Sequence, residues 1–219
     1  MTNCIVRVAL VFVLTTALLP AAAFTNGSFE TPVISGFDFT IVPTGWVKTD
    51  PTNSGLFLEN YSAFSLPTAG GAGTQAYGFG GNGVTTGNLA QTFDTVAGGT
   101  YQVTFQYLIQ QGLEFESLLA QALNGATVLG SDTEIFNNTA WVTKAFSFTA
   151  TSSATTLRFS DNTGTALPGV GNGTNWALDA VTVTQTGGPT GGAVPEPSGF
   201  ALVGLAALTV ARLRKRTSV

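Results

Sequence analysis

The chain has 219 residues, with 8 basic residues, 12 acidic residues, no histidine and one cysteine. Without histidine it cannot form a Ser-His-Asp or Cys-His catalytic site or a histidine-ligated zinc site, and one cysteine cannot form an internal disulfide. Residues 24–193 carry three basic and eleven acidic side chains, a net charge of −8. Nucleic acids are bound through basic patches, so this charge does not suit a nucleic-acid partner.

The first residues predict a signal peptide over residues 1–23. Arg7 supplies a positive charge, Val8–Leu19 is apolar, and Pro20–Ala23 provides small residues suited to cleavage. The apolar segment is short for a transmembrane helix. We therefore expect an N-terminal signal helix that is removed on export, and a mature chain that starts near Phe24.

Residues 24–186 are predicted to form one all-β domain. In the run Tyr101–Ile109 the odd positions are apolar and most even positions are polar, which is typical of an antiparallel strand with one buried face. Comparable runs occur at Trp46–Thr49, Leu56–Asn60, Gln75–Phe79, Asn88–Asp94, Ser117–Leu123, Trp141–Thr149, Thr155–Ser160 and Trp176–Thr184. Short strands separated by glycine- and asparagine-rich turns favour an antiparallel jelly-roll β-sandwich.

Two pairs of acidic residues stand two positions apart: Glu114 with Glu116, and Asp132 with Glu134. Residues i and i+2 of a strand share one face at about 7 Å, which overlaps the spacing of the acid/base pair in glycoside hydrolysis. The alternative is a solvated edge strand or hairpin, where charges protect against aggregation. With no histidine and no well-framed acid pair, we expect the protein not to be an enzyme.

The C-terminal residues combine a linker with an apolar segment and a basic cluster. Gly187–Ala193 is a glycine-rich linker. The apolar run Gly199–Ala211 has 13 residues, so as a helix it spans roughly 20 Å, less than the hydrocarbon core of a bilayer. The basic residues that follow, which should stay cytoplasmic, are Arg212, Arg214, Lys215 and Arg216.

Residues 194–219 resemble the PEP-CTERM sorting signal of Gram-negative bacteria. The resemblance rests on Pro195, Glu196 and Pro197, followed by the short hydrophobic helix and the terminal basic cluster. It implies export, transient anchoring in the inner membrane, cleavage by exosortase and delivery to the cell surface or beyond. The alternative is a C-terminal anchor that is left intact.

The domain itself resembles the galactose-binding-like jelly roll of many carbohydrate-binding modules and DUF642-type domains. The matching fragments, in order, are Asn26–Glu30, Gly45–Trp46, Leu89–Phe93, Ala97–Phe105 and Trp176–Val183. The resemblance implies two antiparallel sheets, often with one structural calcium and a sugar site.

A calcium site is one hypothesis for the acidic residues of these fragments. Asp179 shares parity with Val181 and Val183, so it is predicted to point inward or to lie at the rim of the core, where a carboxylate needs donors or a cation. The resemblance places Glu30 close to Asp179. Oxygens of Glu30, Asp179 and Asn26 would suit calcium. The alternative is that each carboxylate caps local backbone N–H groups.

Aromatic side chains are the candidates for carbohydrate binding, because they stack on sugar rings and carry a polar handle. The candidates are Trp46, Tyr61, Trp141 and Trp176. Trp141 has parity opposite to Phe146 and Phe148, which predicts an outward position. For each of the four, the alternative is packing in the core or at its rim.

Three functions remain open from the sequence. The first is an exported, surface-delivered, non-catalytic β-sandwich that binds carbohydrate in the extracellular matrix or exopolysaccharide. The second is a structural matrix protein or adhesin without a small ligand. The third, a glycoside hydrolase, is the remotest.

Overall fold

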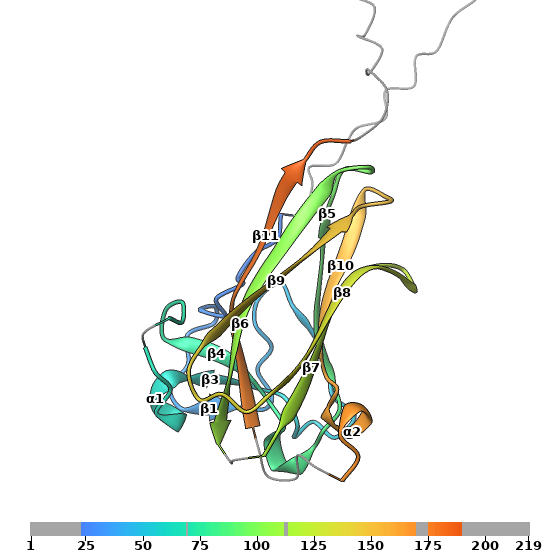
Figure 1. Ribbon diagram of the computed structural model, residues 1–219. Helices are drawn as coiled ribbons and strands as arrows, with labels where there is room; N and C mark the ends of the chain where they lie inside the picture. The colour runs from blue at the N-terminus through green and yellow to red at the C-terminus, as the bar shows by residue number, and fades with distance from the viewer. Residues whose placement is uncertain (1–22, 69, 112–113, 170–174, 190–219) are drawn as a thin grey trace, which may run out of the picture.

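The computed structural model describes residues 23–68, 70–111, 114–169 and 175–189. Within these ranges the chain forms two antiparallel sheets that face each other (Figure 1). The strands are β1 (Phe37–Asp38), β2 (Val47–Thr49), β3 (Phe57–Asn60), β4 (Gln75–Phe79), β5 (Asn88–Asp94), β6 (Thr100–Gln111), β7 (Glu116–Asn124), β8 (Thr127–Phe136), β9 (Val142–Thr149), β10 (Ala154–Asp161) and β11 (Asn175–Gly187). The helices are α1 (Tyr61–Phe64), α2 (Thr163–Ala166) and the 3-10 turn η1 (Gly81–Gly83).

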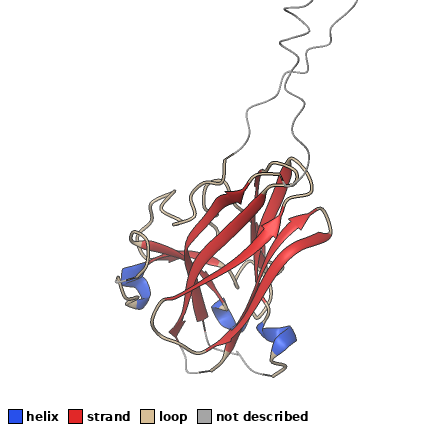
Figure 2. Ribbon diagram, turned by 45° about the horizontal axis from the view of Figure 1, so that its top comes forward, coloured by secondary structure: helices blue, strands red, loops and turns tan. Residues whose placement is uncertain are grey.

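The strand order makes a β-sandwich, which confirms the predicted fold class. One sheet has six strands in the order β1-β3-β4-β11-β6-β9, and the other has five in the order β2-β5-β10-β7-β8. Figure 2 shows the strands as two layers with the helices at their margins. The predicted signal helix, the sorting motif and the C-terminal apolar helix lie outside the described residues. Among those that are described, no helix is long and apolar enough to cross a membrane.

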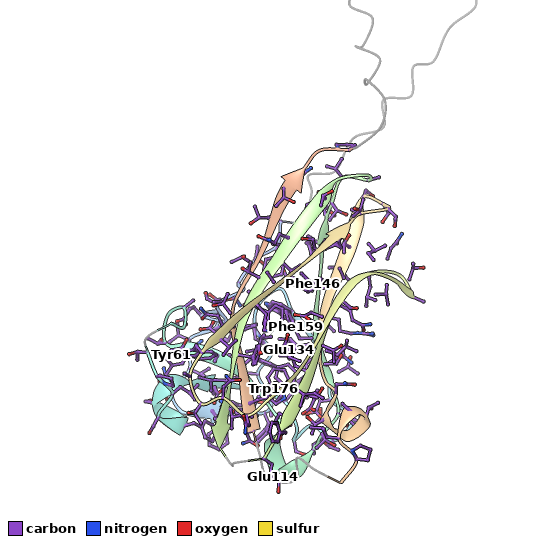
Figure 3. The ribbon with its side chains drawn as sticks, viewed as in Figure 1. Tyr61, Glu114, Glu134, Phe146, Phe159 and Trp176 are labelled. Carbon is purple, nitrogen blue, oxygen red and sulfur yellow. The ribbon has the colours of Figure 1, made fainter. Side chains whose placement is uncertain are left out.

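The main core fills the space between the sheets. The alternation predicted for β6 is confirmed, because its odd-numbered side chains from Tyr101 to Ile109 are all buried in this core. Figure 3 shows Phe159, from the five-stranded sheet, and Trp176, from the six-stranded sheet, between the two layers. The indole of Trp176 stacks on Phe79 with ring centroids 4.0 Å apart. Burying large rings from both sheets is the main source of stability in such a fold.

A bulge in β11 changes which side chains face this core. The pairing of β11 with β6 shifts register between Asp179 and Thr182, and Ala180 has a φ of 50°. The left-handed conformation costs a non-glycine residue about 1–2 kcal/mol, but it lets Leu178 and Val181 both enter the main core. Asp179 consequently lies on the outer face of the six-stranded sheet. The prediction that it points between the sheets is wrong, although it is fully buried.

A second, smaller core covers that outer face. Its buried residues are Tyr61, Leu66, Ala76, Leu108 and Ala177, with Phe64 and Trp141 packed against them. The segment after β3 crosses the sheet here, and α1 is its first turn (Figure 1). Asn60 caps α1 by accepting a hydrogen bond from Ser62 N at 3.1 Å. Residues 61–68 and 70–74 therefore pack onto strands β3, β4, β6 and β11, and we call these residues the cover.

The nine predicted strand runs each overlap a strand of the structure. The two strands without a predicted run are β1, which has two residues, and β8. β8 corresponds to the edge strand that was the alternative for Asp132 and Glu134, since it closes one side of the five-stranded sheet.

Candidate functional site

Two of the four aromatic candidates are core residues. Trp46 is 5% exposed, and its indole nitrogen donates to the Asn26 carbonyl at 3.0 Å. Trp176 is fully buried between Phe79 and Phe136. Neither ring offers a face to a ligand, so the alternative of core packing is correct for both.

The other two candidates lie together in the second core. Trp141 is half-buried on the outer side of the sheet, as its parity predicts, and its indole nitrogen donates to the Pro67 carbonyl at 2.7 Å. Its ring contacts that of Tyr61 at 5.9 Å between centroids. Tyr61 is 4% exposed and donates its hydroxyl hydrogen to Asp179. Both rings hold the cover against the outer face of the six-stranded sheet. Neither ring offers an open face on which a sugar could stack.

The cover also brings together the two carboxylates of the calcium hypothesis. Asp179 Oδ2 accepts from the Tyr61 hydroxyl and from Ala72 N at 2.7 Å, and Asp179 Oδ1 accepts from Ala180 N at 2.6 Å. Glu30 Oε1 accepts from the backbone N–H groups of Thr74 and Gln75, both at 2.8 Å. Burial, with a smaller contribution from the charge of Glu30, raises the pKa of Asp179 to about 7.

These contacts satisfy both carboxylates, but mostly at long range in the sequence: only Ala180 N, which donates to Asp179, is the local backbone group that the capping alternative expects. Every protein group bonded to the two carboxylates is a donor, and Asn26 is engaged elsewhere, with its side chain bonded to the backbone of Thr31 and Thr44. Among the described residues, no group of three or more acidic, histidine or cysteine side chains could hold a metal ion. The residues present thus do not assemble a calcium cage, and calcium stays a prediction of the sequence.

A cluster of four aromatic rings, with one exposed ring at its rim, lies at another place, beside α1. Phe37, Phe39, Phe57 and Phe64 form a continuous cluster, with neighbouring ring centroids 5.1–6.0 Å apart. Phe57 is buried at its centre, whereas Phe37 is 52% exposed at its rim. With residues 81–83 and Asn175 these rings line an open depression of about 360 Å³, which we call the aromatic groove.

Glycines in β4 and η1 make room for the rings. A Cβ on Gly78 would lie 2.3 Å from the Phe57 ring, and one on Gly81 would lie 2.7 Å from Phe39. Asn82, in η1, has a left-handed φ of 53° and donates its amide hydrogen to the Ser54 carbonyl at 3.2 Å. The groove therefore combines aromatic faces with an amide and with backbone that carries no side chains. These groups suit a small ligand with both apolar and polar parts.

These phenylalanines were not among the residues predicted from the sequence to bind a ligand. Phe37 and Phe39 lie in and beside a two-residue strand without visible periodicity. The signal in the sequence was a set of phenylalanines, Phe37, Phe39, Phe57 and Phe64, that do not belong to the alternating apolar positions of the main core.

The acid pairs predicted from spacing are rearranged by the fold. Glu116 is fully buried, and its partner is Asp161 of β10 rather than the exposed Glu114. Thr163 joins the two: its hydroxyl donates to Glu116 Oε2 at 2.5 Å, and its backbone N–H donates to Asp161 Oδ1 at 3.0 Å. Burial, with a smaller contribution from the Asp161 charge, raises the pKa of Glu116 to about 8, and burial raises the pKa of Asp161 to about 6.

Asp132 and Glu134 lie on the edge strand β8. Glu134 forms an ion pair with Lys144 of β9 at 2.7 Å, and it accepts a hydrogen bond from the Tyr107 hydroxyl at 3.1 Å. Figure 3 shows Glu134 near the middle of the molecule, between the layers. These two contacts link β8 to the six-stranded sheet at the edge of the sandwich, which agrees with the edge-strand alternative.

The family model described as "Protein of unknown function (DUF642)" matches residues 69–183, more than half of the chain. The chain belongs to the DUF642 family. No curated protein sequence matches this DUF642 protein.

Solved structures match the same sandwich at low identity. A cyclase from Fischerella sp. TAU in complex with 4-(1H-indol-3-yl)butan-2-one is 16% identical, with a TM-score of 0.57, covering 78% of this chain and 100% of that one. An arabinose-bound α-L-arabinofuranosidase is 14% identical, with a TM-score of 0.52, covering 74% of this chain and 26% of that one. The module TmCBM61 in complex with β-1,4-galactotriose is 14% identical, with a TM-score of 0.49, covering 75% and 98%. The first two likenesses show that the DUF642 protein shares its fold with the cyclase and with one part of the arabinofuranosidase.

The buried acid Glu116 predicts a pH dependence of stability. Its folded pKa of about 8 lies above the ordinary value of 4.5, so the folded chain holds a proton that the unfolded chain releases between these values. Its contribution to stability is present in full below pH 4.5 and is lost as the pH rises to about 8. Compared with the wild type, Glu116→Gln should therefore gain stability steadily from pH 5 to pH 8.5 in urea unfolding.

Asp38→Asn is the control for this experiment. Hydrogen bonds from Thr40 lower the pKa of Asp38, so this group is ionised in both folded and unfolded chains across that range. Its effect on the urea midpoint should be the same at pH 5 and pH 8.5. A Glu116→Gln effect equally independent of pH would contradict the assignment of a neutral Glu116.

Proposed function

We propose that this DUF642 protein is an exported, non-catalytic β-sandwich that binds carbohydrate through the aromatic groove. The observation that carries the proposal is the groove itself, with an exposed Phe37 ring above a cluster of three further phenylalanines. Aromatic faces pack against the apolar faces of sugar rings, while amide and backbone groups bond their hydroxyls. The jelly-roll resemblance of the sequence, which extends to many carbohydrate-binding modules, supports the same ligand class.

The acidic residues support the non-catalytic part of the proposal. Glu116 and Asp161 have carboxyl pKa values that differ, as in an acid/base pair, but they are 0% and 6% exposed and are joined by Thr163. Glu134 is held by Lys144 and Tyr107. Neither set lies in the aromatic groove, so a ligand bound there would meet no carboxylate among the groove's lining residues.

Phe37→Ala should weaken glycan binding roughly tenfold, because it removes the exposed stacking face. The measurement is binding of the purified protein to a panel of neutral and acidic polysaccharides, with calcium present. Ile135→Ala is the matched control, since Ile135 is 53% exposed but lies on β8 at the far edge of the other sheet. Failure to bind any polysaccharide would contradict carbohydrate binding and favour the matrix or adhesin alternative.

The route of export is part of the proposal. The signal pattern of residues 1–23 and the PEP-CTERM-like residues 194–219 support passage through the export machinery, cleavage by exosortase and delivery to the cell surface or extracellular matrix. The mature protein should start near Phe24 and end close to Pro195–Pro197, as measured by intact-mass spectrometry. A mature chain that still carries Arg212–Arg216 would instead support the intact-anchor alternative.

A further inference from the structure

The aromatic groove differs from an ordinary sugar platform in the chemistry of its lining. Its rings are all phenylalanine, which has no hydrogen-bonding group, whereas tryptophan and tyrosine carry one. Among the residues that the structure describes, the polar side chains of the lining are the amides of Asn82 and Asn175, and none of these lining residues is charged. A sugar hydroxyl pressed against these rings would lose its bonds to water without replacement, which is unfavourable.

The charge of the protein restricts the class of sugar that the groove can bind. Residues 24–193 carry a net charge of −8, which repels anionic glycans. Lys48 is the basic residue closest in sequence to Phe39 and Phe57. Its ammonium group forms an ion pair with Asp50 at 3.4 Å and donates hydrogen bonds to the carbonyls of Phe39 and Leu56. The Lys48 side chain is only 7% exposed. This lysine is therefore committed to the fold, and a carboxylated or sulfated sugar would find no partner in it.

A neutral sugar that carries a methyl group fits both constraints. A methyl group buries apolar surface against the phenyl rings and leaves no hydroxyl without a hydrogen-bond partner. Such a group occurs at C6 of a 6-deoxyhexose and in the acetamido group of an N-acetylhexosamine, whose N–H could donate to the side-chain oxygen of Asn82. We propose that the aromatic groove selects a neutral sugar through such a methyl group. This inference rests on the proposed function and specifies its ligand.

The test compares sugars that differ only by the methyl-bearing group. The probes are glucose with 6-deoxyglucose, L-galactose with L-fucose, L-mannose with L-rhamnose, and glucose and galactose with their N-acetylhexosamines, titrated into the purified, isotope-labelled protein by NMR. At least one methyl-bearing member should bind about fourfold more tightly than its partner, the factor expected for one buried carbon. The shifted amide signals should include Phe37, Phe64 and Asn82.

Variants separate the two sources of the methyl group. Asn82→Gly keeps the left-handed backbone and should reduce a preference for N-acetylhexosamines while leaving a preference for 6-deoxyhexoses unchanged. Phe37→Ala should reduce either preference, and Ile135→Ala neither.

The outcomes distinguish this inference from the proposed function. A protein that binds polysaccharides but shows no methyl preference in any pair, or whose signals shift away from the groove, contradicts the inference alone. A protein that binds no glycan of either kind contradicts the proposed function, and the inference with it.

Discussion

The buried carboxylate of Asp179 is the interaction on which the outer side of this sandwich depends. The bulge at Ala180 turns Asp179 away from the main core, onto a face that would otherwise be exposed to solvent. There it accepts the Tyr61 hydroxyl and the Ala72 N–H. A buried carboxylate with too few donors is costly, and this one is satisfied only when both ends of the cover reach it. The carboxylate thus ties the cover to β11.

The aromatic groove follows from that attachment. Tyr61 begins α1 and Phe64 ends it, so fixing Tyr61 on Asp179 also places the Phe64 ring against Phe37 and Phe57. The pairing of Tyr61 N with the Thr74 carbonyl at 2.8 Å, and the contact of Trp141 with Tyr61, hold the same turn from two further sides. A strained residue inside β11 and a ligand-sized depression near the sheet edge are consequently parts of one arrangement. The shape of the groove depends on the position of the cover, and the position of the cover depends on the hydrogen bonds to Asp179.

The regular alternation of apolar and polar residues made the strands of the sandwich predictable. The aromatic groove was not predicted, because it lies where this alternation is interrupted or too short to recognise. Strands with a regular alternation, such as β5 and β6, were predicted because each buries one face along its whole length. Asp179 was assigned to the wrong face because parity holds only without a bulge, and nothing in Asp179-Ala180-Val181 marks a left-handed alanine. Trp46 and Trp176 were candidates by residue type, yet large rings bury more apolar area in a core than on a surface. Phe37 escaped notice because its strand is too short to show a pattern.

Amide hydrogen exchange of Asp179→Asn tests most directly whether this carboxylate holds the cover and the groove together. The substitution keeps the size of the side chain but removes its charge, which weakens the hydrogen bonds from Tyr61 and Ala72. We expect amide protection over residues 61–74 to fall about tenfold or more, while β6 and β10 keep theirs. Unchanged protection over residues 61–74, or an equal loss throughout both sheets, would contradict the account.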